Sequence, residues 1–271
     1  MMNKLSFIGT GNLASAMLKG VVEAKLVLPE NIYIYEVDSN KTKFLRETYG
    51  VNIAENCKSA AESTDVTVVA VKPKDVSGVL SQIKDVCRFI ISTAAGVEVS
   101  VLSSMLESEC SVFRIMPNIN AAVGMAMTAF CCNENATDKQ ISFVSDFCSS
   151  FGEYMRLDEK LFSAFTALAG SSPAFVYEFI NDLAFAGVKN GLTRADALKI
   201  AIQTVSGSAE SVKQLGVHPC ELTDRVCSPA GTTAAGVAAL RKNGFDNAVI
   251  KAVDKTVERD LEMKKYDCKT F

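Results

Sequence analysis

The sequence contains no tryptophan and one histidine, and none of its nine cysteines belongs to a C-x-x-C pattern. Protein zinc sites are built from Cys and His side chains at short spacings, so this distribution excludes a usual zinc site. The two cysteines that stand closest, Cys131 and Cys132, are adjacent. We therefore interpret the cysteines as reduced, small hydrophobic residues buried in a cytoplasmic protein, and we expect no bound metal.

Long apolar runs and clusters of positive charge are also missing. No 18 consecutive residues are all apolar, so we expect no membrane-spanning helix. A predicted strand is reached by Leu5, so we also expect no signal or transit peptide. With a net charge of −3 and no basic run, the chain is not expected to bind nucleic acid or an anionic membrane.

The chain opens with the order strand, glycine turn and helix. Residues 5–8 are a short apolar run, Gly9-Thr10-Gly11 forces a tight turn, and residues 12–20 have the composition of a helix. The first glycine permits the turn and the second lets the backbone approach a phosphate, while Ala14 replaces the third glycine of G-x-G-x-x-G/A. Free N–H groups at the helix start would face the pyrophosphate. We interpret this stretch as a dinucleotide-binding loop; the alternative is a purely structural turn.

The second strand is predicted at residues 31–36, which read NIYIYE. Its last residue, Glu36, stands where a dinucleotide fold places the acid that binds the adenine ribose. A 2′-phosphate at that place would bring like charges together, so Glu36 favours NADH over NADPH. Asn40, Lys41 and Lys43 follow closely and could offset this repulsion. The alternative is a solvated charge at a strand end.

The first half continues the alternation of strand, loop and helix. Continuous apolar strands are predicted at 65–71, 89–92 and 111–115, and each ends in a loop at the edge where open α/β sheets bind ligands. Two more strands, 125–132 and 152–157, flank a helix predicted at 138–151. The fold class is therefore α/β, with a Rossmann-like, doubly wound parallel sheet followed by an all-α C-terminal domain. We predict a dinucleotide-binding domain over 1–157 and a helical substrate-binding and dimerisation domain over 158–271.

Helices replace strands in the second half. Ser172 and Pro173 predict the start of a long helix that is apolar around much of its circumference, with Phe175, Phe179 and Leu183 in one row. Such a helix belongs to a core or to a subunit interface, so we expect this half to form a homodimer. Another helix should open at 193–196, and three more are predicted near 219–226, 231–243 and 245–263.

A second stretch with chemical character reads CSPAGTT, from Cys227 to Thr233. It combines small residues and two adjacent hydroxyls with a helix start that offers free N–H groups. Such a nest suits a carboxylate without a basic side chain. The alternative is an ordinary helix cap rich in Ser and Thr. His218, followed by Pro219, is more simply interpreted as a capping turn than as a catalytic acid.

These segments together resemble the pyrroline-5-carboxylate reductases. The matching stretches follow the family's order over nearly the whole chain: FIGTGNLASAM, AVKPK, STAAG, RIMPN, LAGSSPAF and HPCELTDRVCSPAGTT. The resemblance implies reduction of Δ1-pyrroline-5-carboxylate to L-proline, the last step of proline biosynthesis, by NADPH or NADH, with our preference for NADH resting on Glu36. It also implies a dimer interleaved through the C-terminal domain, with dimers that can assemble into larger rings.

The resemblance also assigns site residues position by position. The cofactor should contact Gly9, Thr10, Gly11, Asn12, Leu13, Asn56, Ala70, Val71, Lys72, Pro73, Ala94, Ala95 and Gly96, and the position of Glu36 after the second strand adds that residue. The substrate should contact Glu159, Ser171, Ser228, Gly231, Thr232 and Thr233. The chain departs from the usual family pattern at Ile119-Asn120, where Thr-Pro is common, at Ala230, where glycine is common, and at Asn181 and Phe185, where acids are common.

The chemistry agrees with what the long helix lacks. Oxidising an alcohol on such a scaffold calls for a general base, commonly a Lys early in this helix, and residues 173–188 contain no Lys or His. A protonated cyclic imine needs only positioning, a carboxylate site and a hydroxyl near nitrogen, for which we select Thr233 as the catalytic residue. Two alternatives stay open: a hydroxyacid dehydrogenase of similar architecture, and a catalytically silent relative that binds nucleotide.

Overall fold

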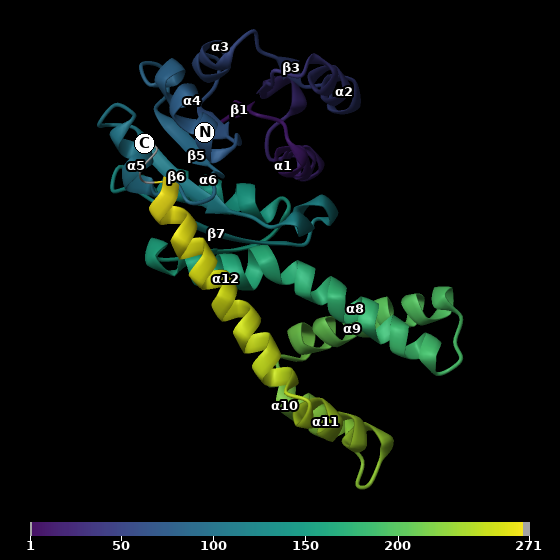
Figure 1. Ribbon diagram of the computed structural model, residues 1–271. Coiled ribbons are helices and arrows are strands. Elements are labelled where there is room, and N and C mark those ends of the chain that lie inside the picture. Colours follow the sequence, from purple (N-terminus) through teal and green to yellow (C-terminus); the bar gives the residue numbers. More distant parts are fainter. Residues whose placement is uncertain (1, 268–271) are drawn as a thin grey trace. The chain divides into compact units, whose positions relative to one another are not determined.

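A computed structural model describes residues 2–267 of the chain (Figure 1). The chain divides into two compact units. The first unit runs to Gly170 and takes up the chain again from Val257, and the second unit is Ser171–Thr256. The boundary at residues 157/158 stays a prediction, because a division by compactness does not establish which part folds alone. Among the described residues, no helix combines the length and apolar character needed to cross a membrane.

An eight-stranded sheet forms the centre of the first unit, in the order β3-β2-β1-β4-β5-β6-β7-β8. Neighbouring strands are parallel except β6 and β7, which are antiparallel. Consequently the carboxyl ends of the first six strands share one edge, as the sequence predicts. The strands are β1 (Leu5–Ile8), β2 (Ile32–Tyr35), β3 (Asn52–Ile53), β4 (Val66–Val69), β5 (Phe89–Ser92), β6 (Ser111–Met116), β7 (Ala126–Cys132) and β8 (Gly152–Arg156).

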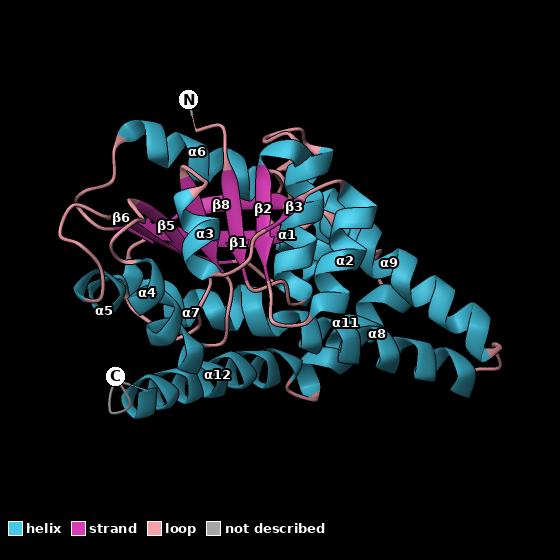
Figure 2. Cartoon of the chain, turned by 90° about the horizontal axis from the view of Figure 1, so that it is seen from above, coloured by secondary structure: helices cyan, strands magenta, loops and turns pink. Residues whose placement is uncertain are grey.

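Helices cover both faces of this sheet, and in Figure 2 the magenta strands lie among them. One face packs against α1 (Asn12–Glu23), α2 (Ser39–Tyr49) and α6 (Asp138–Ser149). The other face packs against α3 (Cys57–Glu62), α4 (Val76–Ile83), α5 (Val99–Ser104) and α7 (Phe162–Phe165). The central strands β1, β4 and β5 are buried along their whole length because helices lie on both sides. The predicted doubly wound fold is confirmed.

Short helical turns connect several elements. They are η1 (Pro29–Asn31), η2 (Pro73–Asp75), η3 (Ile119–Val123), η4 (Glu159–Leu161) and the π-helical turn η5 (Thr166–Ser171). Two of these turns, η2 and η3, follow the carboxyl ends of β4 and β6 and so border the ligand-binding edge of the sheet.

The second unit is helical, as predicted, and α8 packs along α9. Its small buried core consists of Ala184, Ala197 and Ala201, with Ile180 packed against them. The helices are α8 (Ser172–Lys189), α9 (Arg194–Leu215), α10 (Pro219–Val226), α11 (Thr232–Lys242) and α12 (Phe245–Asp267), whose last residues belong to the first unit. Each of the five helices predicted from the sequence is confirmed to within a few residues.

Candidate functional site

The first glycine of the opening loop is fixed by its surroundings. Gly9 has a φ of +89°, a backbone conformation that residues other than glycine rarely adopt. A Cβ at this position would stand 2.6 Å from the Ala70 carbonyl oxygen. The turn after β1 therefore lies directly against the loop after β4, and only glycine allows this close approach.

The second glycine has a different environment. A Cβ at Gly11 would meet no atom within 4 Å, so the space above this residue is open. Gly11 is the N-cap of α1, and no side chain caps the helix there. The first N–H groups of α1 have no partner within their own helix, and the helix dipole makes this end positive. An open space over an uncapped helix start fits a phosphate group.

Glu36, directly after β2, faces this loop. Its Oε2 accepts hydrogen bonds from the Thr10 backbone N–H at 2.9 Å and from the Thr10 hydroxyl at 3.3 Å, and its Oε1 accepts one from the Val37 N–H. Partial burial alone would raise the pKa of the Glu36 carboxyl. Hydrogen bonds from Thr10, Asp38 and Val37 and the charge of Lys41 outweigh burial and lower that pKa, so the group is an anion at neutral pH.

The loops after β1, β2 and β4 enclose a crevice of about 750 Å³. Six predicted cofactor residues line it: Gly9, Gly11, Glu36, Ala70, Val71 and Lys72. Thr10 and Asn12 line a smaller cavity that shares Lys41 with the crevice. The sequence reading assigned no role to Lys74, Ser77 and Gln82, which also line the crevice. The Lys72-Pro73 pair, which follows β4 and begins η2, indicates in the sequence that the chain turns back toward this edge after the strand.

The remaining predicted cofactor residues do not line the crevice. Ala94 is buried and Ala95 is exposed, while Gly96 has a φ of +78° in the loop after β5. Leu13 and Pro73 are half-buried. Asn56 caps α3, because its side-chain oxygen accepts the Ser59 N–H at 2.8 Å and its own N–H donates to the Ser59 hydroxyl oxygen. Contact of these residues with a cofactor stays a prediction.

Glu159 is tied into the first unit by a buried ion pair. Its Oε1 lies 2.8 Å from Arg114 Nη1 and also accepts the Val99 N–H at the start of α5, at 2.9 Å. Arg114 is 2% exposed and its guanidinium stacks over the Phe162 ring at 4.7 Å. Glu159 therefore neutralises a buried cation and joins β6 to α5, and these contacts occupy one of its two carboxylate oxygens. Its predicted contact with substrate remains untested.

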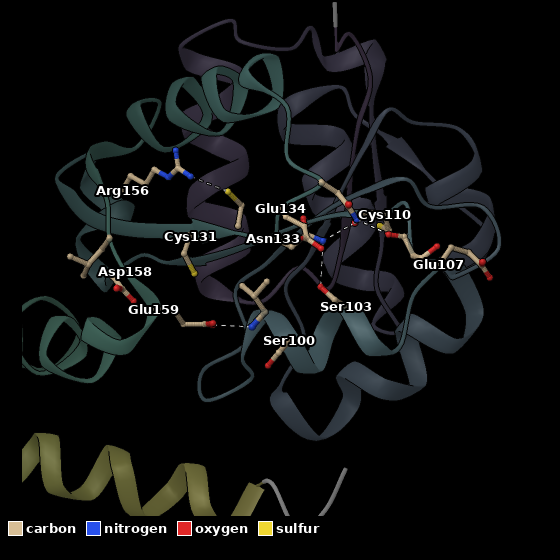
Figure 3. A pocket seen from close by; sticks show the side chains of 15 residues that line it. Ser100, Ser103, Glu107, Cys110, Cys131, Asn133, Glu134, Arg156, Asp158 and Glu159 are labelled. Atoms are coloured by element: carbon tan, nitrogen blue, oxygen red, sulfur yellow. Dashed lines mark hydrogen bonds between the residues drawn. The ribbon is translucent and has the colours of Figure 1, made fainter.

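A second cavity, of about 680 Å³, opens beside this ion pair (Figure 3). Arg156 and several acids and amides line it, and burial raises the pKa of the Cys131 thiol to about 12. Asn133 joins two segments there, because its Nδ2 donates to the Cys110 carbonyl at 2.9 Å and its Oδ1 accepts the Val112 N–H. Among the side chains that the structure describes, residues 2–263, no group of three metal-binding side chains is present.

The predicted substrate stretch is a tight turn in the second unit. The Ser228 carbonyl accepts the Gly231 N–H at 3.0 Å, and a Cβ on Gly231 would collide with the Ser228 side chain. Ala230 has a φ of +54°, a conformation that favours glycine. Gly231 is the N-cap of α11, with no side-chain hydrogen bond to the cap, so the Thr232 and Thr233 N–H groups begin the helix uncapped.

Two further sequence interpretations can be located. His218 Nδ1 accepts the Cys220 N–H at 3.2 Å, so the His-Pro pair is a capping turn at the start of α10, as interpreted. Ser171 is the N-cap residue of α8 and is half-buried at the end of the π-helical turn. Glu159 belongs to the first unit, whereas the second unit contains Ser228, Gly231, Thr232 and Thr233.

Known proteins match both halves of the chain. Residues 159–263 match the family described as pyrroline-5-carboxylate reductase dimerisation, and residues 4–96 match the family described as NADP oxidoreductase, coenzyme F420-dependent. The pyrroline-5-carboxylate reductase of Aquifex aeolicus is 38% identical over 256 residues, which cover 94% of this chain and 96% of that protein. The chain belongs to the pyrroline-5-carboxylate reductase family.

Other reductases of the family are related over a similar length. The Escherichia coli enzyme is 37% identical, with 98% of this chain and 100% of that protein covered. The crystal structure of Plasmodium falciparum pyrroline carboxylate reductase with NADP bound has a TM-score of 0.86 and 33% identity, and covers 97% of this chain and 98% of that chain. These relatives confirm the resemblance, the fold class and the expectation of an oxidoreductase. The match to a dimerisation family supports a homo-oligomer.

Proposed function

We propose that the protein reduces Δ1-pyrroline-5-carboxylate to L-proline with NADH or NADPH. The observation that carries this proposal is the near-complete coverage of reductases of that name, which includes both the glycine loop and the SPAGTT turn. The open, uncapped start of α1 supplies room and N–H donors for the pyrophosphate of the dinucleotide. Gly9, Gly11, Ala70, Val71 and Lys72 would hold it in the crevice.

The substrate would bind at the SPAGTT turn of the second unit. The uncapped N–H of Thr232 would receive the carboxylate at the Gly231 turn, aided by the positive end of α11 and by the Ser228 hydroxyl, because the Gly231 N–H already donates to the Ser228 carbonyl. The Thr233 hydroxyl would hydrogen-bond to the ring nitrogen. Since the imine nitrogen is protonated before reduction, the site needs no strong base, in agreement with the absence of Lys and His from residues 173–188.

The chemistry divides simply between cofactor and protein. When bound, the reduced nicotinamide supplies a hydride to the carbon of the C=N bond. The carbon gains a C–H bond, the π electrons of C=N become the lone pair of the ring nitrogen, and the iminium charge is lost. The residues of the turn contribute by holding the ring flat and the nitrogen fixed, so that the reacting carbon has one orientation.

We further propose that NADH is preferred to NADPH by roughly tenfold in kcat/KM. Glu36 lines the crevice as an anion, and a 2′-phosphate within about 4 Å of it would be repelled by roughly 1 to 4 kcal/mol, depending on solvent access. Lys41, Lys72 and Lys74 line the same crevice and reduce this repulsion, so the preference should be moderate.

Paired kinetics with both cofactors test the preference. Glu36→Ser should shrink or reverse it, whereas Glu30→Ser, at the other end of β2, should leave it unchanged. A wild-type preference for NADPH that Glu36→Ser does not alter would mean that this carboxylate does not face the ribose.

The oligomer is proposed to be a homodimer joined through the second unit, with dimers that assemble into larger rings. Light scattering coupled to size-exclusion chromatography gives the number of subunits directly. Location in the cytoplasm stays a prediction.

An absorbance assay of the nicotinamide with Δ1-pyrroline-5-carboxylate tests the central proposal. Turnover to L-proline supports the reductase. Nucleotide binding without turnover would favour the silent relative. Turnover of a 2-hydroxy acid instead would indicate the dehydrogenase.

A further inference from the structure

Asn118 ends the loop that follows β6, at the ligand-binding edge of the sheet. It follows Met116 and Pro117 and is 7% exposed. A buried amide has two N–H groups and an oxygen to satisfy, so its partners fix its place closely.

Both ends of the Asn118 side chain are engaged. Its Nδ2 donates to the Ala169 carbonyl at 2.8 Å, across 51 residues of sequence. Its Oδ1 accepts the Asn120 N–H at 3.2 Å and so caps η3. The amide therefore ties the loop after β6 to the π-helical turn η5, which leads into α8.

The sequence gives a reason for an outside donor at the Ala169 carbonyl. In a regular α-helix it would accept the N–H of residue 173, four positions on. Residue 173 is proline, which has no N–H, so this regular bond cannot form. The chain widens here into a π-helical turn, and the Asn118 amide donates to the Ala169 carbonyl.

We propose that Asn118 is a positioning residue for the reductase reaction. By holding the Ala169 carbonyl it sets the course of η5 and the place of Ser171, two residues further on, which is expected to contact the substrate. This role rests on the proposed function. Asn118 does not touch the reacting atoms and acts through the backbone of the turn.

The test compares Asn118→Asp with Asn118→Ala. At neutral pH both variants lose the donor to Ala169, so kcat should fall roughly tenfold or more while the KM for the nucleotide stays within about twofold. An ionised carboxylate cannot donate, but a neutral carboxylic acid can. The kcat of Asn118→Asp, divided by that of wild type at each pH, should therefore rise as the pH falls. The same ratio for Asn118→Ala should stay flat.

Asn133 offers a matched control at the opposite end of β6. Figure 3 shows its side chain bonded to Ser103 and to the Cys110 carbonyl, and Asn133 is not among the residues that line the crevice. Asn133→Asp should lower the thermal unfolding midpoint but leave kcat and its pH profile like wild type. Equal losses of kcat from Asn118→Asp and Asn133→Asp would overturn the proposal, as would a wild-type pH profile for Asn118→Asp.

Hydrogen exchange provides a readout that needs no turnover. Amides of residues 166–172 should exchange faster in Asn118→Ala than in wild type, and should be unaffected by Asn133→Asp. Failure of the wild-type protein to reduce the imine would contradict the proposed function. Unchanged exchange in Asn118→Ala would show, independently of activity, that Asn118 does not hold η5 in place. Faster exchange with wild-type kcat would show a structural tie without a role in positioning.

Discussion

The two units bury their apolar side chains very differently. The first unit encloses its sheet between two layers of helices, and phenylalanines fill its interior: Phe7, Phe113, Phe130, Phe147 and Phe151 are all almost fully buried. The second unit, taken by itself, buries only three alanines, at 184, 197 and 201, among the residues that the structure describes. Its large apolar side chains are exposed in the single chain, including Val176, Tyr177, Phe179, Leu183, Phe185, Val188, Ile200 and Ile202.

The first unit therefore has a hydrophobic core of its own, and the second unit does not. Burying a large apolar side chain contributes about 1.5 to 3 kcal/mol, so the three alanines supply only a small part of what a helical unit needs. So many large apolar side chains left exposed indicate an interaction site. The first unit, which holds the crevice at the glycine loop, therefore has its own core within one chain, whereas we expect the second unit, which holds the predicted substrate turn, to depend on association.

Phe179→Asp should have the largest effect. Phe179 is 37% exposed, and its ring centroid lies 5.9 Å from that of Phe245 in the same unit. A charge in an apolar contact is strongly unfavourable, so we expect a monomeric or insoluble protein. Leu28→Asp, at an exposed position of the first unit, should leave the oligomer intact. Light scattering measures both, and a soluble, active dimer from Phe179→Asp would show that this row faces solvent.

Substitutions in the glycine loop should affect the first unit alone. Gly9→Ala forces a side chain into a left-handed conformation 2.6 Å from a backbone oxygen, so it should lower stability and weaken nucleotide binding at least about tenfold. Gly11→Ala meets no protein atom and should weaken binding without loss of stability, because the new methyl takes the space of the phosphate.

Calorimetric titration with NADH and thermal unfolding separate the two glycine variants. Both variants should keep the oligomeric state of wild type. Normal nucleotide affinity in Gly11→Ala would mean that the phosphate does not lie over the start of α1.

Thr233→Val should act on turnover in the second unit. We expect kcat to fall by roughly tenfold or more, the scale of one hydrogen bond that forms fully only in the transition state, with nucleotide KM nearly unchanged. Thr232→Val is the matched control, since only its N–H is expected to contact substrate and this group is retained. Wild-type kcat in Thr233→Val would remove its hydroxyl from the mechanism.

Much of the fold could be predicted because its signals are local. The buried strands are continuous apolar runs, and the glycine loop, the His218-Pro219 cap and the Ser-Pro start of α8 are each contained in a few residues. By contrast, β3 is two residues long and carries no periodic pattern, so its position was not predicted.

Contacts between distant segments could not be predicted in the same way. Glu159 was assigned to the substrate from the family resemblance, but the buried Arg114 that binds it lies 45 residues earlier, within β6. The bond from Asn118 to Ala169 likewise depends on the pairing of two loops. Pro173 could be recognised in the sequence as a helix start. That it removes the regular α-helical donor of the Ala169 carbonyl becomes evident only once the π-helical turn η5 is known.

Ala230→Gly should have the smallest effect, and its sign is informative. Ala230 has a φ of +54°, a conformation that costs alanine about 1 to 2 kcal/mol relative to its usual one, whereas glycine adopts it freely. Glycine in turn loses roughly 0.5 to 1 kcal/mol more conformational freedom on folding. The net expectation is a gain in stability of at most about 1.5 kcal/mol, with kcat near wild type, because the N–H groups of the turn keep their directions.

Ala238→Gly provides a control of opposite sign, because this exposed residue lies within α11, where glycine is about 1 kcal/mol less favourable than alanine. Urea unfolding of both variants and of wild type measures the differences. If Ala230→Gly instead destabilised the protein as much as Ala238→Gly does, the turn would not hold Ala230 in the left-handed conformation, and the departure from the family's second glycine would carry no strain. If Ala230→Gly raised kcat severalfold, the backbone strain at residue 230 would slow turnover in the wild-type protein. The activity of the second unit would then depend on the conformation of this turn as well as on association.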